Sequence, residues 1–413
     1  MQILVAGAGI VGISTAIWLQ RAGHDVTVVD REGPASGTSH GNAGVLAAGA
    51  VVPVTTPGLM GKAPNMLFDP NGPLFLRWSY LPRLIPFLTR YLSYATDAHV
   101  DHYATAMSSL LHDSVEQHQA LAADTPAARF ISTEDYCFGY TTRADFEADS
   151  YGWSKRDAQG VKYEVVSGAE YAQYDPVFGN TFETVVRCKN HGRISDPGAY
   201  VKALAAHFVE QGGTLQITNI NDIETKDGAI AALLTDDGRL SADKIVFAMG
   251  PWSREIAHKL GVKVPFESER GYHIELMNPS AMPRSAMMVA SGKFVLTPME
   301  GRLRAAGIIE FGGLDAPASR GPLDMLRRQV KKLLPDLEYD EIVEWMGHRP
   351  APADSLPVIG ANDTGNLSFS AFGHQHVGLT GGPKTGRVIA ELISERTPNL
   401  DLRPFDPSKF KDQ

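Results

Sequence analysis

Cysteine and positive charge are both scarce in this chain of 413 residues. The two cysteines, Cys137 and Cys188, lie far apart and outside any Cys-x-x-Cys spacing. This excludes a disulfide framework, and we expect two free thiols in a reducing compartment. The 38 Lys and Arg are outnumbered by 47 Asp and Glu, for a formal net charge of −9. Because phosphate backbones are bound by basic surface, the chain is not expected to bind nucleic acid.

Internal repeats, low-complexity tracts and Gly/Ser linkers are missing as well. A strand is expected from residue 2 onward, which leaves no room for a secretory signal, so we expect a cytoplasmic protein. The length of 413 residues, with 43% hydrophobic and 21% charged residues, is too great for one ordinary domain. These observations together predict a soluble enzyme with two closely joined domains.

The first residues combine a buried apolar strand with a glycine turn and a helix. Gly7, Gly9 and Gly12 follow the apolar segment 2–6 in G-x-G-x-x-G spacing. Gly7 permits the tight turn, Gly9 lets the backbone approach a pyrophosphate, and Gly12 lets the helix expected over 10–22 pack closely on the strand. The pattern is typical of a dinucleotide-binding unit.

Two further features of this opening support a dinucleotide. The helix begins at Ile10 and Val11, so its free N–H groups point toward the phosphates. A second strand, 26–29, delivers Asp30, at roughly the 20-residue distance where an acid accepts hydrogen bonds from ribose hydroxyls. NAD and FAD share this unit, and the opening alone does not decide between them.

Nucleotide-fold signals recur far down the chain, so the predicted fold is α/β and discontinuous. A Rossmann-like domain is expected from residues 1–60, 193–262 and 340–413. A second, α+β domain built on an antiparallel sheet is expected from residues 61–192 and 263–339, because long helical stretches (98–123, 143–159) and short alternating strands (263–310) fall there. Gly381, Gly382 and Pro383 are expected to open a helix that ends near Glu395.

Three stretches resemble the FAD-dependent D-amino-acid oxidase and dehydrogenase superfamily. They are the opening with Gly37-Thr38-Ser39-His40-Gly41-Asn42-Ala43-Gly44, the segment 245–253, and a C-terminal run through residues 347–360 and 371–380. The resemblance covers nearly the whole chain in the family's order, and the Ser-x-x-Asn-Ala-Gly loop is most similar to bacterial D-amino-acid dehydrogenases. It implies FAD as the cofactor of the Rossmann-like domain and a substrate site on the second domain.

The resemblance also assigns cofactor contacts. In the family, residues 37–44 pass beside the pyrophosphate and flavin, and the C-terminal run walls the flavin ring. Some relatives attach FAD covalently through a histidine at the place that Gly41 takes here. Since His40 is one residue off, we expect noncovalent FAD. Besides the opening, the expected contacts are Arg31, Ser39, His40, Asn42, Ala43, Gly44, Ile220, Gly250, Trp252, Gly373, Gly378, Leu379 and Thr380.

The glycines of the C-terminal run fit a flavin site on physical grounds. A reduced flavin carries negative charge, and backbone N–H groups with a helix N-terminus stabilise it. Gly373, Gly378, Gly381 and Gly382 permit that close approach. The alternative is that these glycines only make turns.

A substrate site for amino-acid oxidation needs a carboxylate clamp, for which the planar arginine fork is suited. Arg349 matches the family's carboxylate-binding arginine, the alternative being an ion pair with Asp354. Tyr272 resembles a family tyrosine that joins the clamp, with a packing role as the alternative. His374 is expected to tune the flavin or fix its loop, and His376 to face the substrate. No third ligand at a suitable spacing accompanies these histidines, so no metal is expected.

Residues 73–92 mix aromatic, leucine and arginine side chains. The arginines and internal prolines prevent this segment from spanning a bilayer. Two interpretations remain, a helix and loop packed over the FAD-binding domain, and a peripheral contact with the inner face of the cell membrane. A dehydrogenase passes its electrons to an acceptor such as a quinone, which fits the second interpretation.

The sequence as a whole predicts an FAD-dependent dehydrogenase of a small amino acid, an oxidase being an open alternative. Hydride transfer to flavin N5 gives the imino acid, which water converts to a 2-oxo acid and ammonia. The D configuration follows from the resemblance alone. Cyclic or N-alkyl amino acids of the hydroxyproline, proline or sarcosine type are one alternative. A 2-hydroxy acid, with His273 or His376 as base, is another, and an FAD-binding subunit without catalysis is a third.

Overall fold

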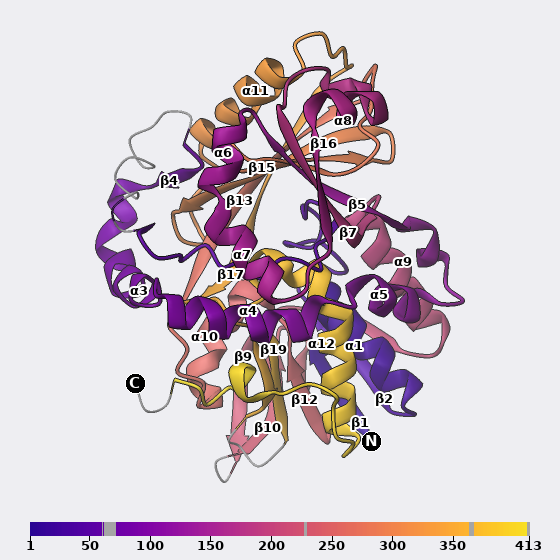
Figure 1. Ribbon diagram of the computed structural model, residues 1–413. Helices are drawn as coiled ribbons and strands as arrows, with labels where there is room; N and C mark the ends of the chain where they lie inside the picture. The colour runs from indigo at the N-terminus through magenta and orange to yellow at the C-terminus, as the bar shows by residue number, and fades with distance from the viewer. Residues whose placement is uncertain (60, 62–71, 227–228, 363–366, 411–413) are drawn as a thin grey trace.

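The computed structural model describes residues 1–59, 61, 72–226, 229–362 and 367–410 (Figure 1). The expected domain boundary at residues 60–61 falls largely on residues outside this set. Cys137 and Cys188 are both buried and free. Within the described ranges, no helix has the length and apolar character needed to cross a membrane.

The first sheet has six strands, which are parallel except at one edge. Ile3 and Val5 of its central strand face one side and Leu4 and Ala6 the other, and all four are buried, as is usual for a parallel sheet covered on both faces. In order across the sheet the strands are β18 (Val358–Ala361), β19 (Ser368–Phe372), β12 (Lys244–Phe247), β1 (Gln2–Ala6), β2 (Asp25–Asp30) and β8 (Thr214–Ile217).

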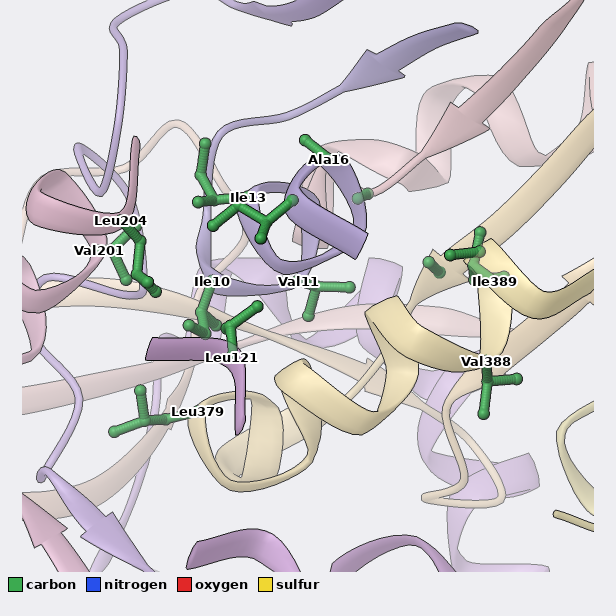
Figure 2. Close-up of a cluster of buried hydrophobic side chains, with 14 of the residues drawn as sticks. Ile10, Val11, Ile13, Ala16, Leu121, Val201, Leu204, Leu379, Val388 and Ile389 are labelled. Atoms are coloured by element: carbon green, nitrogen blue, oxygen red, sulfur yellow. The ribbon is translucent and has the colours of Figure 1, made fainter. Parts of the chain in front are cut away.

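Helices cover one face of this sheet, and α1 and α12 run side by side there (Figure 1). Figure 2 shows their contact, with Ile10, Val11 and Ile13 among residues of several other helices. The opposite face packs against a three-stranded antiparallel sheet and a short helix. The covering helices are α1 (Ile10–Arg21), α4 (Asp97–Leu111), α5 (Ser114–Ala122), α9 (Pro197–Glu210) and α12 (Gly378–Ile393); the opposite layer is β9 (Ile220–Lys226), β10 (Ala229–Thr235), β11 (Gly238–Leu240) and α10 (Ser253–Ala257).

The second sheet has ten strands, most of them antiparallel, and lies above the first in the view of Figure 1. Its main path is β17 (Ile342–Pro352), β13 (Phe266–Met277), β16 (Arg302–Phe311), β15 (Phe294–Met299), β14 (Met287–Val289), β5 (Ile131–Tyr140), β7 (Thr184–Ile194) and β3 (Val45–Leu46), with β4 (Leu74–Leu76) beside β16 and β6 (Tyr163–Ser167) beside β7. The two parallel pairs are β14 with β5 and β16 with β4.

Alternate residues of β13 face opposite sides of this sheet. Tyr272, Ile274 and Leu276 pack in an apolar cluster beneath α11 (Arg320–Leu333). Glu269 and His273 point to the other side, where Glu269 contacts Arg349 and His376, and His273 contacts the carbonyl of Gly41. The remaining helices are α3 (Leu81–Ser93), α6 (Arg143–Ala148), α7 (Ser150–Ala158) and α8 (Gly168–Tyr174), and the short 3-10 turns are η1 (Trp78–Tyr80), η2 (Pro126–Phe130), η3 (Pro176–Phe178), η4 (Gly250–Trp252), η5 (His258–Leu260), η6 (Gln375–Val377) and η7 (Arg403–Phe405).

The predicted fold class is confirmed, but four elements differ from expectation. The helix expected over 98–123 is two helices, α4 and α5, and both pack on α12. The helix expected over 143–159 is likewise two helices, α6 and α7. Strand β17 falls within a segment expected in the Rossmann-like domain, yet it pairs with β13 of the second sheet. Helix α12 begins at Gly378, so Pro383 lies inside it.

The interior proline has a structural consequence. An N–H at position 383 would have bonded the carbonyl of Leu379, and proline has none. That carbonyl instead accepts from Nε2 of His118 at 2.8 Å, while the Nδ1 atom of His118 accepts from the Tyr200 hydroxyl at 2.8 Å. The side chain of α5 thus replaces the missing backbone donor.

Candidate active site

A cleft of about 580 Å³ opens where β1, β2, β12 and β19 end. Crevices at the carboxyl ends of parallel strands are the usual ligand sites of open α/β sheets. Of the residues predicted to bind the cofactor, those that line the cleft are Gly7, Gly9, Ile10, Val11, Asp30, Arg31, Ser39, Asn42, Ile220, Gly250, Trp252, Gly373, Gly378 and Leu379. Gly12, His40, Ala43, Gly44 and Thr380 are not among its lining residues.

The glycines at the start of α1 are required by close packing. Gly7 has a φ of 105°, and a Cβ there would lie 2.5 Å from the carbonyl oxygen of Ala248. A Cβ on Gly12 would lie 1.9 Å from the carbonyl oxygen of Gly7. The N–H of Ile10 faces Ser39, whose Oγ accepts from it at 3.0 Å. This turn and helix N-terminus have the form that holds a pyrophosphate.

The end of β2 provides the expected ribose site. Asp30 accepts from the N–H groups of Ala8 and Gly33, each at 2.8 Å, which fixes its carboxylate at the edge of the cleft. The Arg31 guanidinium lies 4.0 Å from the ring centroid of Trp252. A fixed carboxylate with lone pairs left over suits the hydroxyls of an adenosine ribose.

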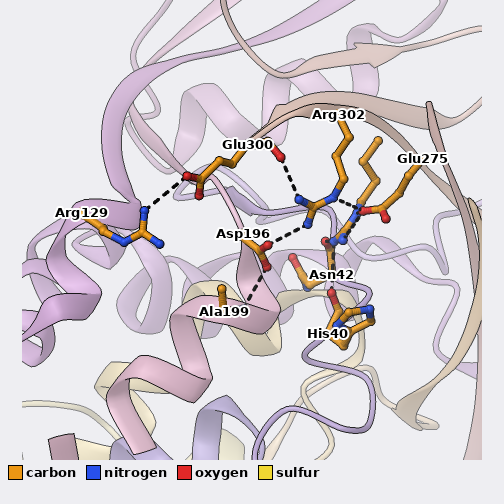
Figure 3. A network of polar contacts seen from close by, with 9 residues as sticks. His40, Asn42, Arg129, Asp196, Ala199, Glu275, Glu300 and Arg302 are labelled. Carbon is orange, nitrogen blue, oxygen red and sulfur yellow. Dashed lines mark hydrogen bonds and ion pairs between the residues drawn. The ribbon is translucent and has the colours of Figure 1, made fainter. Parts of the chain in front are cut away.

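The loop 37–44 is held by a buried arginine of the second sheet. Arg304 is fully buried, donates to the carbonyls of His40 and Asn42, and pairs with Glu275 at 2.6 Å. Arg302 forms ion pairs with both Glu275 and Asp196 (Figure 3). The neighbouring arginine cations lower the pKa of Glu275 to about 2, against the opposing effect of burial. The network therefore ties this loop to the second sheet by charge-assisted hydrogen bonds.

Some loop residues serve the loop itself rather than the cleft. The Asn42 Oδ1 accepts from the N–H of Gly44 at 2.9 Å. His40 lies edge-on to Trp345, with ring centroids 6.1 Å apart. Thr380 donates to the carbonyl of Val45 at 3.2 Å. These contacts position the segment 40–46 between the two sheets.

At the start of α12, Gly373, His374 and Gln375 line the cleft together with Gly378 and Leu379. His374 is fully enclosed, and burial lowers its pKa to about 3. Its Nε2 lies 2.9 Å from the Thr385 hydroxyl. A neutral His374 thus fixes the loop, and the positive end of the α12 dipole faces the cleft where a flavin carries negative charge.

The predicted clamp, Arg349, lies on the face of the second sheet that carries Glu269 and His273. Its guanidinium crosses the sheet over Gly271, where a Cβ would lie 2.5 Å from the Arg349 Cζ atom. Nη1 donates to Glu269 at 3.0 Å and Nη2 to the carbonyl of Gly307 at 3.0 Å. The alternative, an ion pair of Arg349 with Asp354, is wrong, because Asp354 pairs with Lys409 at 2.8 Å.

The structure brings His376 to Arg349 but keeps Tyr272 away. His376 Nδ1 lies 3.5 Å from the carboxylate of Glu269 that also binds Arg349. Trp345, Gly347 and Pro350 of the same strand line the cleft. Arg349, Glu269 and His376 are not among its lining residues and lie beside them, at its border. Tyr272 lies on the opposite face of the sheet, is 1% exposed, and donates to Glu310 at 2.5 Å. This burial fits the packing alternative for Tyr272.

Sequence reasoning missed Glu269, Trp345 and His348 at this border. Trp345 stacks on His273 with ring centroids 5.0 Å apart and lies against Gly41. The signal for Glu269 was present, because the strand segment 266–277 carries three glutamates and one arginine, charged residues that a strand interior rarely buries without function. His118 gave no such signal, since its partners come from distant segments.

Comparison with known proteins agrees with this geometry. Residues 2–392 match the family described as FAD dependent oxidoreductase. A D-amino-acid oxidase of Bradyrhizobium diazoefficiens is 36% identical over 416 residues, 99% of each chain. A D-amino acid dehydrogenase of Rhizobium rhizogenes is 30% identical over 420 residues, 99% of this chain and 100% of the other.

Solved structures share the fold at lower identity. Glycine oxidase from Geobacillus kaustophilus has a TM-score of 0.74 at 20% identity, covering 98% of this chain and 97% of the other. L-Proline dehydrogenase from P. horikoshii has a TM-score of 0.73 at 18% identity, covering 100% and 98%. The chain belongs to the family of FAD-dependent oxidoreductases. The predicted family and the FAD cofactor are confirmed, and the cleft fits that cofactor.

Proposed function

We propose that this enzyme oxidises a small D-amino acid to the imino acid, which water converts to the 2-oxo acid and ammonia. FAD, bound without a covalent link, supplies a two-electron acceptor for the hydride of the substrate Cα. Arg349 holds the substrate carboxylate, and the protein keeps the reacting atoms apart from bulk water. The relatives named D-amino-acid oxidase and D-amino acid dehydrogenase support this substrate class.

The observation that carries the proposal is the position of Arg349 at the border of the FAD cleft. Its guanidinium is fixed by Glu269 and by the carbonyls of Gly307 and Ile308, so it is presented in one orientation. Within the described part of the chain, no acceptor meets its Nε. A planar, fixed donor edge next to the flavin site is what recognition of a carboxylate requires.

His273 is an unsuitable base for a 2-hydroxy acid, so that alternative depends on His376. Such a substrate requires a base for its hydroxyl proton. Burial lowers the pKa of His273 to about 3, and its Nδ1 faces the carbonyl of Gly41 at 3.2 Å. Such an imidazole is a weak base. Cyclic and N-alkyl amino acids use the same clamp and differ only in the shape of the pocket.

We further propose a quinone as electron acceptor for this protein, at the cytoplasmic face of the cell membrane. On α3 and the turn before it, Trp78 is 59% exposed and Ile85 is 53% exposed. Aromatic and aliphatic side chains beside exposed Arg83 suit an anionic membrane surface. Co-sedimentation with vesicles containing anionic lipid is expected for the wild type and lost in Trp78→Ser/Ile85→Ser. Equal sedimentation of both proteins contradicts the contact.

The substrate class is tested by mixing the yellow holoenzyme, without oxygen, with D-amino, L-amino, cyclic, N-methyl and 2-hydroxy acids. Bleaching of the flavin band by D-amino acids is expected. Bleaching by proline or sarcosine alone moves the assignment to the cyclic or N-alkyl class. Bleaching by hydroxy acids alone contradicts the amine chemistry, and no bleaching at all indicates an FAD-binding protein without this activity.

A further inference from the structure

Glu269 lies behind the clamp and contacts two residues of the site at one oxygen atom. Its side chain is 1% exposed. Oε1 accepts from Arg349 Nη1 at 3.0 Å and lies 3.5 Å from Nδ1 of His376. The three residues come from β13, β17 and η6, so the contact joins the second sheet to the loop at the start of α12.

A buried carboxylate is stable only when partners offset its loss of solvation. The second oxygen of Glu269, Oε2, has no hydrogen-bond partner among the residues that the structure describes. Its negative charge therefore depends on Arg349 and His376. Burial favours the neutral acid, but His376 and Arg349 lower the pKa of Glu269 below its usual range.

One other titratable group faces this carboxylate, Tyr91 of α3, whose pKa is raised by burial and by the charge of Glu269. The Tyr91 hydroxyl stays protonated at neutral pH and accordingly brings no charge to the group. Glu269, Arg349 and a neutral His376 sum to zero charge, and a protonated His376 raises the sum to +1.

The chemistry of amine oxidation demands a proton acceptor. An amino acid at neutral pH carries an ammonium group, whose nitrogen has no lone pair to form the C=N bond when the Cα hydride leaves. One ammonium proton must therefore leave before the hydride does. Arg349 remains protonated in proteins and is no acceptor. His376 has its Nδ1 toward Glu269, which leaves Nε2 on the other side of a ring whose side chain is 36% exposed.

We propose that His376 Nε2 takes this proton and that Glu269 is the positioning residue that orients His376 and Arg349 together. The N–H bond of the ammonium breaks, an Nε2–H bond forms, and the electron pair stays on the substrate nitrogen. That pair forms the C=N bond as the Cα–H pair leaves as hydride to FAD. The inference rests on the proposed amino-acid substrate and deepens it.

The charges favour this transfer. Before it, a zwitterion meets a group of zero net charge. Afterwards an anionic amino acid meets a group of charge +1, and the imidazolium lies beside a buried carboxylate, as in histidine–carboxylate pairs of other enzymes. Glu269 thereby acts through His376 and Arg349 without touching the substrate.

The test compares Glu269→Gln with a matched control, Glu267→Gln. Glu267 lies two positions earlier on the same face of β13, is equally buried, and bonds Tyr80 and Arg254 instead. NMR of holoenzyme labelled at histidine, with His376→Gln for assignment, reports on the two ring nitrogens of His376. We expect Glu269→Gln to change these signals, because a neutral amide replaces the carboxylate beside Nδ1, and Glu267→Gln to leave them unchanged.

The second readout is the pH dependence of anaerobic flavin reduction. Glu269→Gln should move the acidic limb to lower pH and slow the maximal rate about 10-fold. His376→Gln should lose that limb, and its rate of flavin reduction should keep rising with pH until the substrate's own amine is deprotonated. The His376 side chain is partly exposed, so this substitution should leave the core intact. Unchanged His376 ring signals in Glu269→Gln overturn the inference, as does a KM effect with the wild-type pH profile. Failure of the proposed function gives a different result, because in that case no amino acid reduces the flavin of the wild-type enzyme.

Discussion

Three side chains at one point of the second sheet determine what the candidate site can recognise. Arg349 provides a fixed guanidinium, Glu269 holds it from behind, and His376 shares the same carboxylate oxygen. Gly271 is equally necessary, because the guanidinium passes where a larger residue would place its Cβ. An arginine that spans a strand in this way is rigid, and rigidity lowers the entropy lost when a substrate binds.

Gly271→Ala tests that geometry. The new methyl group would lie 2.5 Å from Arg349 Cζ, so the guanidinium must move from its fixed position, while the strand backbone accepts alanine without strain. We expect KM for the amino acid to rise about 10-fold, with a smaller change in kcat, because about 1.4 kcal/mol of binding is lost. Steady-state kinetics measure both KM and kcat. Gly61→Ala, where a Cβ meets no atom of the described residues within 4 Å, is the control. Wild-type KM in Gly271→Ala contradicts the position of the clamp.

At the scale of elements, the loop 37–44 depends on a network from another part of the chain. Arg304→Met removes the donor to the His40 and Asn42 carbonyls and leaves Glu275 short of a partner. Breaking a buried pair costs about 3–5 kcal/mol, so we expect weaker FAD binding and a lower melting temperature. Flavin fluorescence titration and thermal unfolding measure both effects.

The same network contains its own control (Figure 3). Arg129 pairs with Glu300 at 3.3 Å, but both side chains are more than half exposed, at 63% and 57%. Exposed pairs contribute about 0–1 kcal/mol, so Arg129→Met should leave FAD affinity unchanged. Equal losses in the two variants would show that the network acts only through general stability.

Elements with strong local signals were predictable from the sequence. The strand, turn and helix at residues 2–21 follow from an apolar run and glycine spacing. The ends of α9 carry local signals of the same kind, because Asp196 caps its start and a Gly-Gly pair follows its end. Strand β17 was not placed correctly, because membership of a sheet depends on long-range pairing with β13. The early start of α12 likewise depends on His118, a residue of another helix.

The candidate site was predictable only in part, for a similar reason. The cofactor cleft was predictable because the glycine motifs and the residues after strand ends are signals within short stretches of sequence. The partners of Arg349 are a strand neighbour and a loop residue, and neither spacing nor composition relates Glu269 to His376. Tyr272 was expected at the clamp, but the alternation of β13 turns it to the opposite face. A shift of one position along a strand moves a side chain to the other face of the sheet and so changes the role it can have.

At the scale of the whole molecule, several histidines are buried in neutral form. Burial lowers the pKa of His118 and of His191 to about 4, and that of His374 to about 3. The unfolded chain titrates these groups near pH 6.5. Below that pH the unfolded chain takes up protons that the folded chain does not, so the free energy of unfolding falls as the pH drops from about 6.5 toward 4.

Urea unfolding of the holoenzyme at pH 7.5, 6 and 5 checks this expectation. Each neutral histidine contributes up to about 1.4 kcal/mol per pH unit within the window. His118→Gln should make the dependence shallower, whereas His112→Gln, whose side chain is 63% exposed, should not. Stability that is flat between pH 7.5 and 5 contradicts the buried neutral state.

The central claim is that Arg349 selects an amino acid by its carboxylate at the FAD site. The most direct measurement is the rate of anaerobic flavin reduction by D-alanine and by ethylamine, which lacks the carboxylate, in wild type and in Arg349→Lys. Wild type should prefer D-alanine by at least about 100-fold, and Arg349→Lys should narrow that preference by at least about 10-fold, because the planar fork is lost while the charge remains. An identical preference in both proteins would contradict the account.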